Sequence, residues 1–392
     1  MKILTILFFL LLPGMVSVIH SEESLQFDLN MFRKDDVLVK QQVEYKNPGR
    51  LGENVLWNFG KLKTVNKKYS LTYSGTVMDS DSIIVGTQHQ TRYYYSLNND
   101  SLLLHGYENP TTKVTYKNPE MILHFPMKYG EQTADYYQGS GTYCDKLEVL
   151  ACGSTRSVAD SYGVMILPSG DTLRHVIRVR TTKLISENIH PFKRNSLGNR
   201  LVSANKLITA DSIQCRLNND SVVLMVDTYR WYAAGYRYPV FETVRTGNYR
   251  NNSKTTYFTT AFFYSPEDHQ YLKNDEKNKS LLTELRNKDA GNEKKNTPGT
   301  ENPKEPDVEF TYNFYPNPVK TQLSVEYYIS EDARVECGLY NTSGMLLYRS
   351  PKKTLQAGAY QDIIDMNRYS QGEYILRILV NDKAISERII KK

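Results

Sequence analysis

The stretch LRHVIRVR at residues 173–180 shows most directly how this chain folds. Successive side chains of a strand point to opposite faces of a sheet, so its alternation gathers one apolar set on a single face, namely Leu173, His175, Ile177 and Val179. The opposite face carries Arg174, Val176, Arg178 and Arg180. We therefore predict a strand with one buried face and one cationic face. The cationic face could bind an acidic glycan or a lipid head group, and a solvated strand surface is the simpler alternative.

Short runs of the same kind continue from about residue 26 to residue 264, separated by Gly, Pro, Asn, Asp and Ser. The tetrapeptide NNDS occurs at residues 98–101 and again at residues 218–221, each time before an apolar run, and predicts two strand-turn-strand units. The chain also contains 30 Tyr but only 2 Trp, a bias toward strand-forming residues. We predict an all-β region at residues 22–265 with a β-sandwich-like architecture.

The N-terminus has the pattern of a signal peptide. Lys2 precedes a largely apolar run at residues 3–12, which Pro13 and Gly14 end. This run is too short for the roughly 20 apolar residues of a membrane-spanning helix. We predict a signal peptide at residues 1–21 and no transmembrane segment in the mature chain.

The composition changes at residue 266. Residues 266–309 are rich in Lys, Glu, Asp and Asn and contain few apolar residues, so they should not bury enough surface to become ordered. We predict a disordered, charged linker there, with one short helical turn near Leu281. Apolar and polar residues alternate again at residues 322–329 and 374–380, which predicts a small immunoglobulin-like β-sandwich at residues 310–392.

The C-terminal segment contains short blocks in a fixed order. They are FYPNPV at 314–319, YNTSGMLL at 340–347, LQAGAY at 355–360, SQGEYIL at 370–376 and IIKK at 389–392. In this order and spacing they closely resemble the type A C-terminal sorting domain of type IX secretion substrates from Bacteroidota. The residues that carry the resemblance are Tyr315, Pro316, Asn317, Pro318, Gly344, Gly358, Gly372, Tyr374, Lys391 and Lys392.

The resemblance implies that residues 310–392 direct the protein through the outer-membrane translocon to the cell surface or the medium. It also implies that a sortase removes the domain and that the remainder can be joined to anionic lipopolysaccharide. Residues 22–265 would then be the exported passenger, and they are called the passenger region below. Blocks within it, such as ADSYG at 159–163 and LPSG at 167–170, resemble an uncharacterised region of other secreted Bacteroidota proteins, which implies no activity.

The passenger region contains no recognisable catalytic motif, so its catalytic residues are unknown. Carboxylates such as Glu131, Asp135, Asp145 and Glu242 cannot be paired from sequence. Aromatic residues mixed with Arg could hold a glycan or protein ligand, and ordinary sheet packing is the alternative; the candidates are Tyr229, Trp231, Tyr232 and Tyr236. We expect a binding or structural module, with a secreted hydrolase acting on polysaccharide or peptide as the alternative.

The four cysteines form no Cys-x-x-Cys pair, so neither a metal site nor a cofactor is expected. Cys144 and Cys152 could pair across a hairpin in an oxidising compartment or remain free thiols. The net charge of +6 is spread along the chain without a dense basic stripe. This distribution does not support nucleic-acid binding.

Overall fold

The computed structural model describes residues 24–78, 81–98, 100–194, 200–201, 206–250, 253–292, 310–329, 331–381 and 383–392. The predicted signal peptide at residues 1–21 and the last part of the predicted linker, residues 293–309, lie outside them. Within the described ranges, no helix is both long enough and apolar enough to cross a membrane.

The described residues of the passenger region form seventeen strands and two α-helices. The strands are β1 (Ser24–Leu25), β2 (Val37–Val43), β3 (Gly52–Asn58), β4 (Thr64–Met78), β5 (Asp81–Gln88), β6 (Thr91–Asn98), β7 (Ser101–Glu108), β8 (Thr112–His124), β9 (Met127–Lys128), β10 (Gln132–Tyr143), β11 (Leu147–Ile166), β12 (Thr172–Pro191), β13 (Lys193–Arg194), β14 (Arg200–Leu201), β15 (Val223–Ala233), β16 (Phe241–Arg250) and β17 (Ser253–Phe263). The helices are α1 (Phe27–Asn30) and α2 (Ala210–Asn219).

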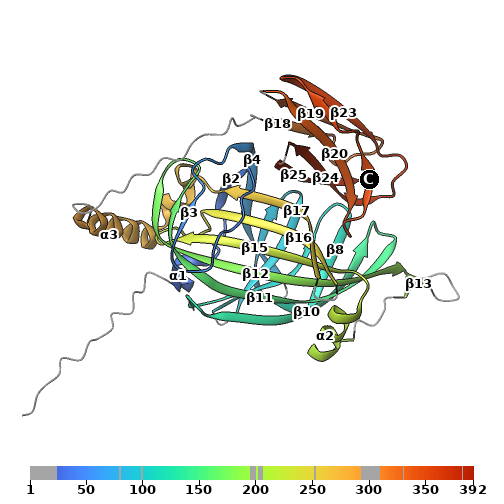
Figure 1. The fold of residues 1–392 in the computed structure, drawn as a ribbon. Helices are drawn as coiled ribbons and strands as arrows, with labels where there is room; N and C mark the ends of the chain where they lie inside the picture. Colours follow the sequence, from blue (N-terminus) through green and yellow to red (C-terminus); the bar gives the residue numbers. More distant parts are fainter. Residues whose placement is uncertain are drawn as a thin grey trace, which may run out of the picture.

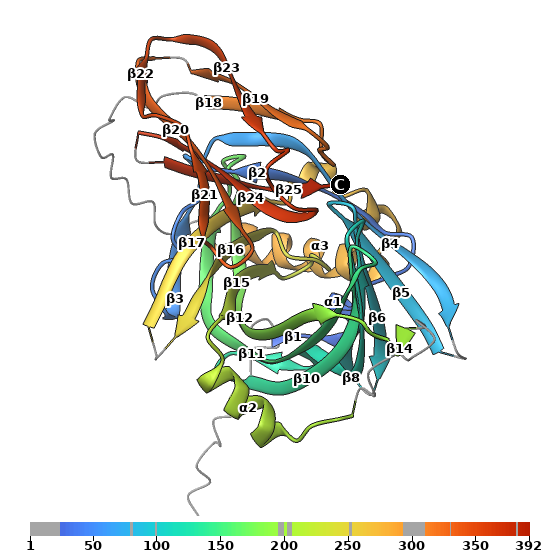
Figure 2. The same ribbon diagram turned by 90° about the vertical axis from the view of Figure 1, so that its right-hand side faces the viewer.

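Twelve of these strands close into one ring-shaped sheet, which Figure 2 shows from one end. Around the ring the order is β2, β4, β5, β6, β7, β8, β10, β11, β12, β15, β16 and β17, and all neighbours pair in antiparallel fashion. Closure comes from β17 and β2, where Ala261 lies opposite Val43 and Phe263 opposite Gln41. The all-β prediction is confirmed. The β-sandwich-like architecture predicted for the passenger region is not what this pairing forms, because its sheet closes on itself.

The strand at residues 173–180 is covered on both faces at Arg178, whereas Arg174 is exposed. On the outside lies β3, which pairs with β11 in parallel and brings Trp57 over the ring. Arg178 is 0% exposed, and its guanidinium donates to Asp160 Oδ1 and to the Pro48 carbonyl, each at 2.6 Å. Arg180 pairs with Asp227 at 3.1 Å. Of the three arginines of the predicted cationic face, Arg178 is therefore buried and Arg180 is paired with a carboxylate, which leaves Arg174 exposed.

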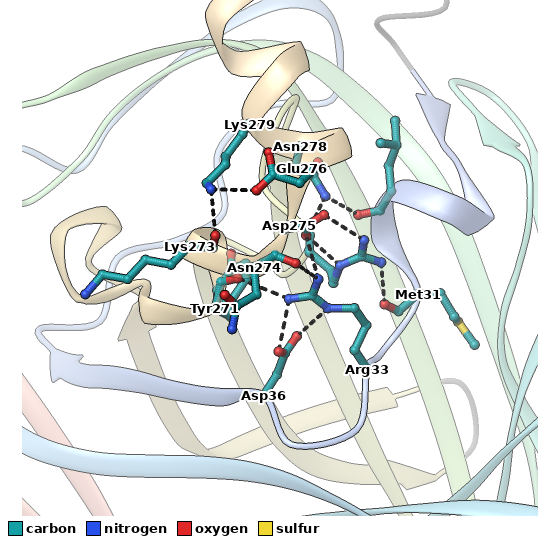
Figure 3. A network of polar contacts seen from close by, with 12 residues as sticks. Met31, Arg33, Asp36, Tyr271, Lys273, Asn274, Asp275, Glu276, Asn278 and Lys279 are labelled. Carbon is teal, nitrogen blue, oxygen red and sulfur yellow. Dashed lines mark hydrogen bonds and ion pairs between the residues drawn. The ribbon is translucent and has the colours of Figure 1, made fainter.

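The first part of the predicted linker is helical and packs on the ring. It forms the 3-10 helices η2 (Pro266–Asp268) and η3 (Gln270–Asn274), followed by α3 (Glu276–Asn292). Arg237 Nε donates to Asp275 Oδ2 at 2.7 Å, Arg33 Nη1 donates to the Asn274 carbonyl at 2.9 Å, and Asn278 Nδ2 donates to the Leu29 carbonyl at 3.0 Å (Figure 3). The prediction of disorder is wrong for residues 266–292. Its premise was a lack of apolar burial, whereas Tyr271 and Leu285 are buried and polar contacts hold the segment as well.

Replacing Asp275 by Ala is expected to lower the free energy of unfolding of the passenger region by about 3 kcal/mol. The change leaves the buried Arg237 guanidinium without its carboxylate. Urea unfolding followed by near-ultraviolet circular dichroism measures the loss. Lys277→Ala is the matched control, because Lys277 and Asp28 form an exposed pair and its removal should not be measurable. Equal unfolding curves for the two variants would show that this network does not anchor α3.

The C-terminal residues form two small sheets around a core of their own. Their strands are β18 (Phe310–Tyr315), β19 (Gln322–Ile329), β20 (Ala333–Asn341), β21 (Leu346–Arg349), β22 (Lys353–Leu355), β23 (Gly358–Asp365), β24 (Gly372–Val380) and β25 (Lys383–Lys391). One sheet has the order β18-β19-β23, and the other has the order β21-β20-β24-β25 with β22 beside β20. Leu323, Cys337 and Leu376 are fully buried in the shared core. The immunoglobulin-like topology stays a prediction.

All four cysteines are free thiols, so the proposed bond between Cys144 and Cys152 is not formed. Cys144 lies in the turn between β10 and β11, where Tyr143 pairs with Leu147. The residue opposite Cys152 in this register is Gln138. The two thiols therefore sit at different positions along the hairpin, and Cys152 instead packs against α2.

Candidate functional site

The four aromatic residues predicted to bind a ligand at the surface are all buried. Tyr229, Trp231 and Tyr236 pack in the layer between the ring and the segment that contains β3, where Trp231 and Phe59 have ring centroids 5.3 Å apart. Trp231 is 0% exposed. Tyr232 alone of the four points into the ring. In this structure these four side chains therefore form no exposed aromatic platform.

The ring instead encloses a cavity of about 290 Å³. Side chains from nine of its strands line this cavity, namely β2, β4, β5, β6, β7, β8, β12, β15 and β16. Much of the wall consists of tyrosine rings, those of Tyr73, Tyr93, Tyr95, Tyr232, Tyr238 and Tyr264. An enclosed, largely apolar space with a few polar groups is the usual form of a small-molecule site.

The first polar group of the cavity wall is built around Glu242 on β16. Arg230 Nε donates to Glu242 Oε2 at 2.6 Å, and Lys40 Nζ lies 3.7 Å from Oε1. Burial alone would raise the pKa of Glu242, but Arg230 and Lys40 outweigh burial and lower it. Burial lowers the pKa of Lys40 to about 8, so this amine stays mostly protonated at neutral pH. The Arg230 side chain is 32% exposed although it lies inside the ring, because its free edge faces the cavity.

A second polar group lies on β8 and β12. Lys183 Nζ donates to Glu120 Oε2 and Thr155 Oγ1 donates to Glu120 Oε1, each at 2.5 Å. The Lys183 ammonium also lies 4.5 Å from the centre of the Tyr137 ring, a favourable cation-π position. Glu120 and Lys183 both line the cavity. The pairs Arg230–Glu242 and Lys183–Glu120 are each neutral overall. Lys40, which lies behind Glu242, adds one positive charge.

The structure does not bring together the four carboxylates considered from sequence. Glu131 accepts from the Lys128 amide at 2.8 Å, Asp135 accepts from the Met121 amide at 2.8 Å, and Asp145 lies in the β10–β11 turn. Of these four carboxylates only Glu242 lines the cavity, and Glu120, which was not among them, lines it as well. Sequence reasoning missed Glu120, because it follows Asn118 and Pro119, residue types that normally end a strand. In the described ranges, no three His, Cys, Asp or Glu side chains come together as a metal site.

The predicted sorting residues lie in two kinds of position. The Asn317 side chain joins the first and last motif blocks, because Nδ2 donates to the Arg388 carbonyl and Oδ1 accepts from the Ile390 amide, each at 2.8 Å. Lys391 is buried and its Nζ donates to the Lys320 carbonyl at 2.5 Å, while Lys392 is exposed. Beside them lie Tyr315, Pro316 and Pro318, so this part of the motif forms one structural unit.

The remaining motif residues shape separate turns. Gly344 closes the turn after β20 with φ of 81°, a backbone conformation that favours glycine. Gly358 and Gly372 begin β23 and β24 with φ of 155° and 151°. The Tyr374 hydroxyl donates to the Ser370 carbonyl at 2.6 Å and fixes the turn before β24. The motif therefore supports the fold of the domain at several places.

Comparison with known families identifies this C-terminal unit. The family model described as the secretion system C-terminal sorting domain matches residues 313–392. These residues are a type IX secretion system C-terminal sorting domain, and the protein is exported to the cell surface or secreted. The region from Phe310 to Lys392 is called the sorting domain below.

The comparisons leave the passenger region without an activity. No curated protein matches the chain. Among solved structures, the chain is similar to dimeric latent PorU from Porphyromonas gingivalis, with 8% sequence identity and a TM-score of 0.21. The match covers 91% of this chain and 34% of that chain, so this chain spans about a third of the length of PorU. A likeness at that TM-score carries no argument about the passenger region.

Proposed function

We propose that the passenger region is a binding module that holds a small amphipathic molecule inside its ring of strands. The observation that carries the proposal is the enclosed cavity of about 290 Å³ with tyrosine walls and the free edge of Arg230. Flat rings provide apolar contact area, and the guanidinium provides a directional partner for an anionic group. The net positive charge of the Arg230, Glu242 and Lys40 group favours a ligand with one negative charge. Type IX secretion delivers this module to the outside of the cell.

The sorting domain indicates the partners of this protein during and after export. It interacts with the type IX secretion machinery. We propose that a sortase removes the sorting domain and that the passenger region is then attached to anionic lipopolysaccharide. The ordered motif blocks support both steps. We do not propose a surface site for a glycan or protein ligand at the four aromatic residues, because all four are buried.

A secreted hydrolase is the second candidate, because Glu120 and Glu242 line the same cavity. Hydrolysis of a glycosidic bond needs one carboxyl group with a raised pKa that can act as an acid. Glu242 has a lowered pKa, and Glu120 is held by Lys183 and Thr155. Both carboxylates therefore pair with the Arg or Lys side chains beside them, which favours a binding role over catalysis.

Anilinonaphthalene sulfonate, a flat aromatic anion, is expected to bind saturably to the full chain at one site per molecule. Val226 lines the cavity from β15, and Val226→Trp should fill it and weaken equilibrium binding at least about tenfold. Val222→Trp is the matched control, because Val222 is exposed just before β15. Equilibrium fluorescence titration measures binding, with circular dichroism to confirm the fold. Unchanged binding by the Val226 variant would exclude the cavity as the site.

A further inference from the structure

The sorting domain lies against one end of the ring, and α3 lies toward the other end (Figures 1 and 2). Its contacts come from most of the way around that end. Asn109 Nδ2 donates to Glu373 Oε1 at 2.6 Å from the β7–β8 turn, and the Tyr143 hydroxyl donates to the Gln371 carbonyl at 3.3 Å from the end of β10. On the far side, Asn248 and Tyr257 donate to the Ser343 and Thr342 carbonyls, each at 2.8 Å.

A buried carboxylate lies within this interface. Glu387 of β25 is only 7% exposed. It accepts a hydrogen bond from the Tyr69 hydroxyl of β4 at 3.0 Å and another from the Tyr312 hydroxyl of its own domain. The Tyr312 hydroxyl also lies 2.8 Å from the side-chain amide oxygen of Gln42 on β2. Strands β2 and β4 of the ring are thus joined to the sorting domain by one hydrogen-bonded group.

The cavity extends toward the covered end of the ring along β5. Gln88 lines the cavity at the last position of β5, and Gln90 in the following turn donates to the Asn317 carbonyl of the sorting domain at 3.3 Å. At the opposite end the cavity is closed by packed rings, with the centroids of Phe32 and Tyr238 5.9 Å apart and those of Tyr238 and Tyr271 4.9 Å apart.

Charges of the sorting domain also act on the inside of the ring. Glu187 lies on β12, four residues beyond the cavity residue Lys183 toward the covered end. Desolvation raises the pKa of Glu187, although the residue is exposed, and the neighbouring carboxylate Glu373 of the sorting domain raises it further. Glu373 itself accepts a hydrogen bond from Asn109 Nδ2 at the rim, at 2.6 Å.

We propose that the sorting domain is an internal cap that controls access to the cavity of the passenger region. Ligand then exchanges with the cavity only when this domain moves away from the rim or is separated from it. The proposal rests on the proposed function, since it concerns the same cavity. Hydrogen bonds between polar groups join the two domains at the rim, as in interfaces between domains that can separate. The fold thereby couples the binding module to the part of the chain that directs its export.

A reversible disulfide between the sorting domain and the rim of the ring tests this proposal in the full chain. Asn248→Cys and Ser343→Cys place two thiols at contacting positions across the rim, and Cys215→Ser removes the exposed native thiol. The matched control combines Thr311→Cys with Tyr328→Cys. These exposed residues lie opposite each other on β18 and β19, so their disulfide forms entirely within the sorting domain. Mass spectrometry verifies each disulfide. Stopped-flow fluorescence then measures uptake of anilinonaphthalene sulfonate in the oxidised and the reduced protein.

Oxidation across the rim is expected to slow uptake at least about tenfold and reduction to restore it, whereas the control disulfide should leave the rate unchanged. Glu387→Ala should accelerate uptake without any disulfide. Equal rates in the oxidised and reduced rim variant would overturn the cap and leave the cavity as the binding site. Absence of saturable binding in every form would overturn the proposed function, and the cap with it.

Discussion

Raising the pH above about 10 is expected to unfold the passenger region in one cooperative step. Burial raises the pKa of four buried tyrosines well above the ordinary value of 10.0, those of Tyr73, Tyr116, Tyr137 and Tyr264. The unfolded chain loses these protons near pH 10 while the folded chain keeps them. Their contribution to stability is therefore complete below pH 10 and is lost as the pH rises further.

The size of this effect rivals the whole stability of a domain. Each such tyrosine removes about 1.4 kcal/mol per pH unit, so four remove roughly 5 to 6 kcal/mol per unit, against a typical total of about 5 to 15 kcal/mol. Lys40 acts in the opposite sense, because its pKa of about 8 lies below the ordinary 10.5 and stability rises with pH between these values. One lysine does not offset four tyrosines.

Tyrosinate absorbance and near-ultraviolet circular dichroism, followed together during an alkaline titration, measure this transition. Tyr137→Phe should reduce the slope of stability against pH by about 1.4 kcal/mol per unit. Tyr328→Phe should not change the slope, because Tyr328 is 47% exposed. Smooth ionisation of all 30 tyrosines with an intact dichroism spectrum would contradict the prediction.

Deleting residues 310–392 is expected to abolish delivery of the protein to the cell surface or medium. The deletion removes the sorting domain, while the predicted signal peptide still directs export across the inner membrane. The truncated protein should accumulate in the periplasm and remain folded, because the core of the sorting domain and the cores of the passenger region share no residues. Fractionation with an antibody against the passenger region measures the distribution.

Glu387→Ala is the matched control for the deletion. It weakens docking on the rim but keeps the motif residues, so the variant should still reach the outside of the cell. Full external levels of the truncated chain, without a lysis marker, would refute the assignment of sorting to residues 310–392. Periplasmic retention of the Glu387 variant would instead show that docking is itself required for export.

Local sequence patterns were reliable where the structure they encode is local. The NNDS at residues 98–101 forms the predicted hairpin, with Asn98 opposite Ser101 between β6 and β7. The same letters at residues 218–221 end α2 instead, and β15 follows. The difference lies outside the tetrapeptide, because Ile213 and Leu217 of α2 are buried beside Cys152 and Val223. A tertiary contact thus overrode an identical turn signal.

The candidate site could not have been found in the same way. Alternation predicted that half of the side chains of each strand are buried. It did not predict whether a buried side chain packs against a second sheet, packs against β3 or lines an internal cavity. Trp231 and Tyr232 are adjacent in sequence, yet one lies beneath β3 and the other lines the cavity. Glu120 lies on β8 and Glu242 on β16, and they line the same cavity only because the sheet curls into a ring.

The sequence by itself determined the destination of this protein and its all-β character, because ordered motif blocks and two-residue periods are local properties of a chain. Only the tertiary structure decided that the passenger region forms a ring with a cavity and that the sorting domain covers its rim. Apart from β2 and β17, neighbours in the ring follow one another in chain order, with β3, β9 and β13–β14 inserted between three of the pairs, and closure depends on β2 meeting β17. That pairing joins residues about 220 positions apart, and no local pattern specifies such a long-range register.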